Sequence, residues 1–265
     1  MKTILTIAGS DCSGGAGIQA DIKTITVHGM YAMSVITALT AQNTMGISGI
    51  YDVDPEFVGQ QLDSIFTDII PDCIKIGMVV SSDIVKVIAD KLKQYKAGTV
   101  IVDPVMVSSS GSRLLSEEAQ DTLVKDLFPI ATLLTPNILE AQVLSGKVIT
   151  TRQQQEETAV LLGQSYQTAV LIKGGHRIGE AEDVLWENGE IHWYKASRIN
   201  NDNTHGTGCT LSSAIACQLA KGETMKDSIS KAKEYLTGAI KAGLNLGHGS
   251  GPLNHSYPLE MGERK

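Results

Sequence analysis

Residues 203–210 include Cys209, the side chain of this sequence that is best placed for chemistry. They read Asn-Thr-His-Gly-Thr-Gly-Cys-Thr and lead into Leu211, Ile215 and Leu219, a spacing that predicts an amphipathic helix ending near Gly222. The start of a helix leaves several backbone N–H groups unpaired and carries the positive end of the helix dipole, so it attracts phosphate. The segment therefore predicts an anion hole.

Cys209 falls in or just before the first turn of this helix. The dipole and the unpaired N–H groups favour a thiolate there, which makes Cys209 a candidate base or nucleophile. The alternative is that Cys209 is a small buried hydrophobic side chain. We favour the functional interpretation because Gly206 and Gly208 let a ligand approach the backbone, and a purely structural turn has no need of both.

The composition is that of an ordinary enzyme. The chain has 265 residues, 42% of them hydrophobic and 19% charged, and we expect residues 1–265 to form a single α/β domain. A net charge of -7 with scattered basic residues argues against a nucleic-acid surface. The apolar run at 4–8 is too short for a signal peptide, and no segment approaches the roughly 18 apolar residues of a membrane span. We therefore expect a cytoplasmic protein whose cysteines, which lack zinc-ligand spacing, are free thiols.

Short β-rich runs alternate with helix-like stretches along the chain. This pattern is typical of a mostly parallel sheet covered by helices on both faces. Asn188-Gly189 separates two further β-rich runs, at 183–186 and 190–194, and predicts an antiparallel hairpin. In such sheets, ligands bind beyond the carboxyl ends of the parallel strands. We expect those strands at 3–8, 73–78, 99–103, 131–135 and 169–173.

Loops rich in glycine and serine follow two of these strands. The loop at 9–17 has neither the G-x-G-x-x-G nor the G-x-x-x-x-G-K-[ST] pattern, so a dinucleotide-binding or Walker-type site is not expected. It either contacts a ligand or only packs a helix on a strand. The segment 104–112, directly after Asp103, has the composition of a flap that closes over a ligand.

Polar residues also follow the strands expected at 131–135 and 169–173. Each of these two groups has a functional and a structural interpretation. Asn137 and Glu140 suit a hydrated magnesium ion beside phosphates, or equally an N-cap and the third position of a helix. Lys173, followed by two glycines and His176, suits a phosphate contact or a tight turn. Taken together, the strand ends indicate transfer of a phosphoryl group from a nucleotide.

The order and spacing of these motifs resemble those of the bacterial hydroxymethylpyrimidine and phosphomethylpyrimidine kinases of thiamine biosynthesis. The resemblance extends over essentially the whole chain. It implies a ribokinase-like three-layer α/β/α fold with a mostly parallel central sheet. It also implies an enzyme that uses ATP to phosphorylate 4-amino-5-hydroxymethyl-2-methylpyrimidine and then its monophosphate. The segments that carry the resemblance are 7–11, 13–21, 34–44, 75–78, 103–106, 135–137, 173–176 and 203–211.

The same resemblance implies roles for individual side chains in binding the pyrimidine and in the reaction. Cys209 would accept the proton of the substrate hydroxyl, and the amide of Gln42 would both donate to and accept from an aminopyrimidine edge. The residues implied in the pyrimidine pocket are Asp11, Gln42, Met78 and Val105, and the catalytic ones are Cys209, Gly206, Gly208 and Lys173.

The resemblance further implies ATP and Mg²⁺ as cofactors and a homodimer as the assembly. No nucleic acid or membrane partner is expected. The nucleotide would contact Asn137, Lys173, Thr207 and Gly208, and Mg²⁺ would be held by Glu140 and Asp103.

Two departures from the family pattern affect these expectations. Cys12 stands where proline is usual, and if the first loop meets the anion hole, Cys12 and Cys209 would lie close enough to oxidise together. The flap sequence at 108–111 lacks the lysine that many relatives carry there, which bears on ATP affinity.

Three other functions stay open. A pyridoxal or pyridoxine kinase is the nearest, because pyridine and pyrimidine rings are similar in size. A sugar kinase is disfavoured because Cys209 stands where those enzymes have a catalytic aspartate. A catalytically silent ligand-binding protein would use the same fold without turnover.

Overall fold

The structure, a computed structural model, describes residues 1–106, 115–175, 181–196 and 199–262. Their strands form one sheet in the order β3-β2-β1-β4-β5-β6-β7-β8-β9. The pairs from β2 to β7 are parallel, whereas β3, β8 and β9 run antiparallel to their neighbours. The predicted mostly parallel sheet with an antiparallel hairpin is therefore confirmed.

The strands and helices have the following bounds. The strands are β1 (Thr3–Asp11), β2 (Tyr31–Asn43), β3 (Gly46–Asp52), β4 (Cys73–Ile76), β5 (Thr99–Val102), β6 (Leu133–Leu134), β7 (Ala169–Ile172), β8 (Ala181–Glu187) and β9 (Glu190–Ala196). The α-helices are α1 (Gly17–Val27), α2 (Pro55–Phe66), α3 (Ser82–Gln94), α4 (Glu117–Thr122), α5 (Ile138–Ser145), α6 (Arg152–Tyr166), α7 (Thr207–Ala220), α8 (Met225–Ala242) and α9 (Tyr257–Gly262). Short helical turns follow α4 at Leu123–Leu127 and Phe128–Ile130.

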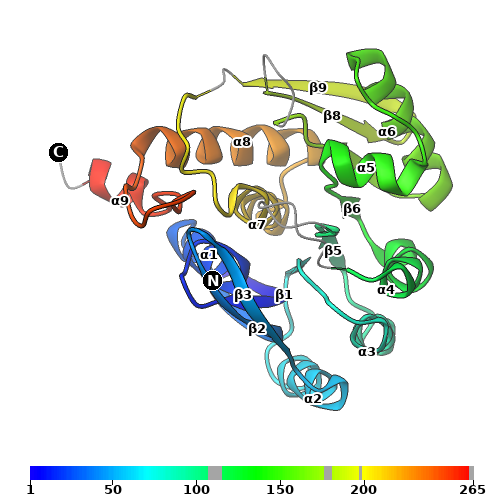
Figure 1. The fold of residues 1–265 in the computed structure, drawn as a ribbon. Coiled ribbons are helices and arrows are strands. Elements are labelled where there is room, and N and C mark those ends of the chain that lie inside the picture. Colours follow the sequence, from blue (N-terminus) through cyan, green and yellow to red (C-terminus); the bar gives the residue numbers. More distant parts are fainter. Residues whose placement is uncertain (107–114, 176–180, 197–198, 263–265) are drawn as a thin grey trace.

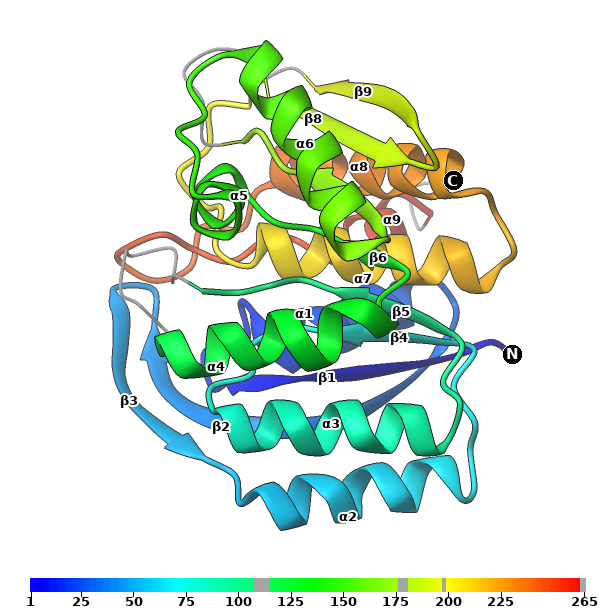
Figure 2. The ribbon, with the colours of Figure 1, turned by 90° about the vertical axis from the view of Figure 1, so that its right-hand side faces the viewer.

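Helices cover both faces of the sheet, as Figures 1 and 2 show. One apolar core lies between the sheet and α2, α3, α5 and α6, and includes the fully buried Ile88 and Phe128. A second core lies between the opposite face and α1, α7 and α8, and includes Ile25 and Ile215. Each fully buried side chain of this size contributes about 1.5–3 kcal/mol of burial free energy. These two cores produce the predicted three-layer α/β/α arrangement.

All five predicted parallel strands are present, with shifted ends. β1 continues to Asp11 because its ladder with β2 extends to the pair Asp11 and Thr40. β6 is shorter than predicted and consists of Leu133–Leu134. β2 and β3 are not among the predicted strands; they form a long curved ribbon at one edge of the sheet (Figure 2).

The helix predicted after the glycine-rich segment is α7, but it is not amphipathic. Its residues from Thr210 to Gln218 are all buried. The reason is that α7 packs against the sheet, α1 and α8 at once. Small side chains such as Ser213 and Ala214 allow this close packing. Gly222, with φ of 90°, lies just past the end of the helix, as predicted.

Candidate active site at the start of α7

The first turn of α7 is open to a ligand. Gly206 is its N-cap residue, with φ of 86°, and no described side chain caps the helix. A Cβ atom on Gly206 would lie 1.9 Å from the carbonyl oxygen of Gly15, so only glycine fits this contact. The α7 start is thus pressed against the glycine-rich loop after β1. The N–H of Thr207 donates to the Thr204 carbonyl at 3.3 Å, and the N–H of Gly208 is available to an anion.

Two charged residues from neighbouring strand ends meet beside this turn. Lys173, after β7, places Nζ 2.6 Å from Oδ1 of Asp103, which follows β5. Thr135 donates to the same oxygen at 3.1 Å. A Cβ on Gly208 would lie 3.3 Å from Asp103 Oδ2 and 3.5 Å from Lys173 Nζ. Burial alone would lower the pKa of Lys173, but Asp103 and Glu140 outweigh it and raise that pKa, which keeps the ammonium charged.

Asn137 and Glu140 form a capping box at the start of α5. The Asn137 side chain accepts from the Glu140 N–H at 2.9 Å, and Oε2 of Glu140 accepts from the Asn137 N–H at 2.7 Å. The helix-capping interpretation of this pair is therefore confirmed. Burial raises the pKa of Glu140 to about 7, against the opposing effect of Lys173 and with a further contribution from Asp103. Glu140 thus belongs electrostatically to the Asp103 and Lys173 pair.

Asp11 organises the loop after β1. Its Oδ1 accepts from the N–H and hydroxyl of Ser13 at 2.8 and 2.7 Å, and its Oδ2 accepts from the N–H groups of Gly15 and Ala16 at 3.1 and 2.9 Å. His205 Nε2 lies 2.8 Å from the same Oδ2. Burial opposes the charge, but hydrogen bonds from His205 and Ser13 outweigh it and hold the pKa of Asp11 well below its usual range. The carboxylate therefore ties the loop to the residue just before the α7 N-cap.

Gln42 joins the same cluster from β2. Its Nε2 lies 3.2 Å from Nε2 of His205, and its Oε1 lies 3.0 Å from the hydroxyl of Thr40. Since the His205 nitrogen donates to Asp11, a second donor cannot pair with it. The Gln42 amide fits the network when turned over, with its oxygen toward His205 and its NH₂ toward Thr40, whose hydroxyl then donates to the carbonyl of Ser10 at 3.1 Å. The network thereby fixes the orientation of the Gln42 amide.

The other predicted site residues lie around these clusters. Met78 follows β4 and packs against Gly9, where a Cβ would lie 2.4 Å from the Met78 methyl group. The N–H of Val105 donates to the carbonyl of Asp103 at 2.8 Å. Thr207 is the first residue of α7. Residues 107–112 of the predicted flap and His176 lie outside the residues that the structure describes.

Cys209 is the third residue of α7 and is half-buried. Burial raises the pKa of its thiol, although Lys75 and the backbone of Gly17 act in the opposite direction. The expected net preference for the thiolate is therefore wrong for this structure, because desolvation exceeds the favourable charges. Cys12 and Cys209 are both free, and the Cys12 thiol instead donates to the carbonyl of Gln42 at 3.2 Å.

Sequence reasoning missed the pairing of Lys75 with Asp21. Both side chains have an exposed fraction of 0%, and they lie between β4, α1 and α7. The available signal was a lysine inside the apolar run Cys-Ile-Lys-Ile, where a charge requires a buried partner.

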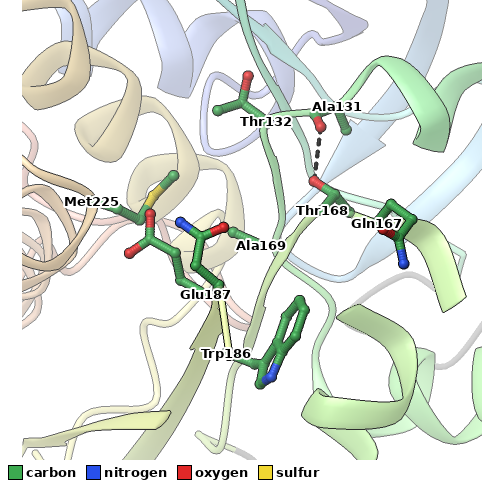
Figure 3. A pocket seen from close by; sticks show the side chains of 9 residues that line it. Ala131, Thr132, Gln167, Thr168, Ala169, Trp186, Glu187 and Met225 are labelled. Atoms are coloured by element: carbon green, nitrogen blue, oxygen red, sulfur yellow. Dashed lines mark hydrogen bonds between the residues drawn. The ribbon is translucent and has the colours of Figure 1, made fainter. Parts of the chain in front are cut away.

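Two cavities lie away from these clusters. One, of about 340 Å³, is at the amino ends of β6 and β7, beside Trp186 and Met225 (Figure 3). The other, of about 620 Å³, lies between β9 and α8 and is lined by Tyr194 and Lys233 among others. Neither is lined by a predicted site residue. Across the described ranges, every helix is too short or too polar to cross a membrane.

Known proteins match nearly the full length of the chain. It is 48% identical over 259 residues to the thiamine biosynthesis bifunctional protein ThiED of Geobacter sulfurreducens, covering 97% of this chain but 53% of that protein. The chain thus spans about half of that relative. It is 44% identical to the hydroxymethylpyrimidine/phosphomethylpyrimidine kinase of Streptomyces coelicolor, covering 97% of this chain and 95% of the relative.

Solved structures and a family model agree with these relatives. The crystal structure of phosphomethylpyrimidine kinase from Clostridium difficile has a TM-score of 0.81 and 42% identity, covering 91% of this chain and all of that one. An ADP complex of Bacillus subtilis pyridoxal kinase has a TM-score of 0.89 and 35% identity, covering 98% of this chain and 99% of that one. The family model described as phosphomethylpyrimidine kinase matches residues 11–254. The chain therefore belongs to the phosphomethylpyrimidine kinase family.

Proposed function

We propose that this protein transfers the γ-phosphoryl group of ATP to 4-amino-5-hydroxymethyl-2-methylpyrimidine and then to the monophosphate that results. The observation that carries the proposal is the meeting of two clusters at one helix start. Gln42 pairs with His205 just before the α7 N-cap, and Lys173 and Asp103 lie beside Gly208 in the first turn. A pyrimidine alcohol held by the first cluster would point its hydroxyl at phosphates held by the second.

In this proposal Cys209 is the base for the alcohol. The thiolate form of Cys209, which burial disfavours and Lys75 favours, takes the hydroxyl proton. The oxygen then attacks the γ-phosphorus, and the bond to the β-phosphate oxygen breaks to release ADP. The N–H group of Gly208 in the first turn of α7 and the ammonium of Lys173 would neutralise the charge on the transferring group. Most of the rate enhancement would come from positioning and charge neutralisation.

Mg²⁺ fits this site in its usual mode. In the described ranges no group of three or more His, Cys, Asp or Glu side chains could hold a metal alone. Proteins commonly bind Mg²⁺ through one or two carboxylates together with substrate phosphates. Asp103 and Glu140 are the buried carboxylates beside Lys173 and would hold the ion, and Asn137 would contact the nucleotide. When bound, Mg²⁺ supplies charge neutralisation on the phosphate chain.

The test is a Mg²⁺-dependent ATP turnover assay with four acceptors offered separately. These are the hydroxymethylpyrimidine, its monophosphate, pyridoxal and ribose, with products identified by mass. We expect both pyrimidines to be phosphorylated and ribose to be untouched. Turnover of neither pyrimidine, by protein that is folded and binds ATP, would contradict the proposal.

Pyridoxal phosphorylation is a second candidate activity. The observation that favours it is the close structural match to the Bacillus subtilis pyridoxal kinase. An aldehyde near Cys209 would form a reversible hemithioacetal, which changes the ultraviolet spectrum of pyridoxal. A spectral change that is lost in Cys209→Ala, together with pyridoxal turnover, would support this activity.

We further propose a cytoplasmic homodimer. β3 is an edge strand that exposes Ile50 and Tyr51, with exposed fractions of 43% and 72%, and Met45 in the turn before it is 68% exposed. Such an edge is a template for pairing with a second copy. Sedimentation of the protein should give the mass of two chains, and Ile50→Lys should shift it toward one.

A further inference from the structure

A fully buried ion pair lies beneath the first turns of α7. Nζ of Lys75 is 3.0 and 2.9 Å from the two carboxylate oxygens of Asp21, and both side chains have an exposed fraction of 0%. The hydroxyls of Thr6 and Ser213 donate to the same carboxylate at 2.6 and 2.7 Å. Burying a charge pair carries a large desolvation cost, and apolar residues often stabilise such a position as well or better. Stability alone therefore does not account for the pair.

Two contacts, one helical turn apart, tie this pair to Cys209. The backbone of Gly17, the first residue of α1, faces the Cys209 thiol and lowers its pKa. One turn further along both helices, Asp21 of α1 accepts from Ser213 of α7. Residues four apart lie on the same face of a helix. The ion pair therefore occupies the next position after Cys209 along the contact between α1 and α7.

The ammonium reaches this contact from the sheet below. Lys75 lies on β4, and a Cβ on Gly77 would lie 2.7 Å from its Nζ and 3.1 Å from the Cβ of Ala8. The absence of a side chain at Gly77 thus leaves space for the charge. Burial raises the pKa of the Cys209 thiol, and among its charged neighbours Lys75 acts most strongly, in the lowering direction.

Other charges face the thiol from the elements packed around it. Asp21 from α1 and Asp103 from the end of β5 raise the thiol pKa, each less than Lys75 lowers it. Lys173, from the end of β7, also interacts with Cys209, and it is already paired with Asp103. Lys75 thus lowers the pKa of the Cys209 thiol more than its own counter-ion, Asp21, raises it.

We propose that Lys75 is a positioning residue for the reaction, whose ammonium, held by Asp21 and Ser213, stabilises the Cys209 thiolate that accepts the substrate proton. In that step the O–H bond of the alcohol breaks and its proton goes to sulfur. The oxygen forms the bond to the γ-phosphorus, and ADP leaves with the electrons of the broken P–O bond. The inference rests on the proposed function because it assigns a partner to the proposed base.

The two proposed acceptors provide an internal comparison. An alcohol must lose a proton during transfer, so it needs the thiolate. The monophosphate attacks through a phosphate oxygen that is already largely ionised at neutral pH, because the second pKa of a phosphate monoester is about 6. Loss of the Lys75 charge should therefore slow transfer to the alcohol and spare transfer to the monophosphate.

The experiment compares the protein with the double variant Lys75→Gln/Asp21→Asn, which removes both charges and keeps hydrogen-bonding groups. The rate of alkylation of Cys209 by iodoacetamide is followed against pH, with the modified peptide identified by mass. We expect the midpoint to rise by about one pH unit. At pH 7, turnover of the alcohol should fall about tenfold, in line with that shift, and turnover of the monophosphate should stay within about twofold.

A matched control removes a different ion pair. Lys91 and Asp63 pair at 2.7 Å between α3 and α2, outside the site. The variant Lys91→Gln/Asp63→Asn should leave the Cys209 midpoint unchanged. An unchanged midpoint in folded Lys75→Gln/Asp21→Asn, or an equal loss on both acceptors, would overturn the inference. If the unaltered protein phosphorylates neither pyrimidine, the proposed function fails, and the alkylation profiles still decide the role of Lys75.

A second measurement covers the case in which the double variant does not fold. In protein labelled at the lysine Cε carbons, the chemical shift of the Lys75 resonance is followed against pH. It should change in a step whose midpoint equals that of Cys209 alkylation. That step should vanish in Cys209→Ser. A Lys75 resonance that does not respond at that midpoint would contradict the inference.

Discussion

Among the helices that begin at the carboxyl edge of the sheet, α5 and α7 begin in opposite ways. α5 is closed by its own side chains, because Asn137 and Glu140 satisfy each other's backbone N–H groups at 2.9 and 2.7 Å. α7 begins at Gly206 without a cap from any described side chain. At the α5 start the N–H groups of Asn137 and Glu140 are used within the chain, whereas in the first turn of α7 the N–H of Gly208 is left for a ligand.

The difference shows how to separate a structural helix start from a functional one. A polar residue followed three positions later by Glu satisfies the helix locally and requires nothing else. A start made of glycines gives up that stabilisation and is held instead by the packing of Gly206 on Gly15. At such a start, Cys209 and the free N–H of Gly208 face the same ligand.

The largest expected effect comes from removing the reactive side chain of the open start. Cys209→Ala keeps the helix backbone and removes the proposed base, so kcat with the pyrimidine alcohol should fall about 10²–10⁴-fold. The steady-state assay should show a much smaller loss with the monophosphate. Cys217→Ala, on the same helix but in the apolar core, should leave kcat within about twofold. Equal activity of Cys209→Ala and the parent would remove Cys209 from the reaction and leave the anion hole intact.

The next largest effect is on stability, and it compares a glycine at the start of α7 with a glycine at the end of α5. Gly206→Ala combines a φ of 86° with a Cβ only 1.9 Å from a carbonyl oxygen, so the free energy of unfolding should fall by about 2–4 kcal/mol. Gly146→Ala, at the end of α5, has a φ of 66° and no atom within 4 Å of its Cβ, so about 1 kcal/mol is expected. Urea unfolding of both variants measures the difference. Similar losses would mean that the contact with Gly15 adds nothing.

The buried carboxyl of Glu140 at the start of α5 should make the free energy of unfolding depend on pH. Burial raises the folded-state pKa of Glu140 to about 7 from 4.5, so the folded protein binds this proton more tightly than the unfolded chain does. The resulting stabilisation is complete below 4.5 and is lost as the pH rises through 7. Glu140→Gln keeps an oxygen for the Asn137 N–H and removes the titration.

Urea unfolding at about pH 5, 6, 7 and 8 tests this expectation. The free energy of unfolding of the parent should fall with pH relative to Glu140→Gln, by about 1–3 kcal/mol across the series. Two curves that stay parallel would show that the Glu140 carboxyl titrates alike in the folded and unfolded chain.

Much of the sheet could be predicted from the sequence, because each parallel strand is a short apolar run bounded by glycine or polar residues. β2 and β3 could not, because β2 buries the polar Thr37 and exposes the apolar Leu39, and β3 is largely exposed at the sheet edge. Their pairing depends on the antiparallel register with each other and on the ladder between β2 and β1.

The strand-end residues of the candidate site could be predicted in the same way, because parallel strands end at a common edge. Asp103, Lys173 and Gly208 are together as expected. The pairing of Lys75 with Asp21 could not be predicted, because these residues are 54 positions apart and meet only when α1 packs on the sheet. The net effect of burial on the Cys209 pKa was also beyond the sequence, since it depends on how far water is excluded.

The smallest expected effect comes from variants of Asn137, which test whether this residue only caps α5. Asn137→Ala removes the α5 cap and should lower the free energy of unfolding by about 1 kcal/mol. Asn137→Asp also caps well, so its stability should stay within about 0.5 kcal/mol of the parent. If Asn137 contacts the nucleotide as proposed, its amide donors matter, and Asn137→Asp should raise KM for ATP severalfold because a carboxylate repels phosphate. An unchanged KM in Asn137→Asp would restrict Asn137 to capping, and the open start of α7 would then bind the phosphates without help from α5.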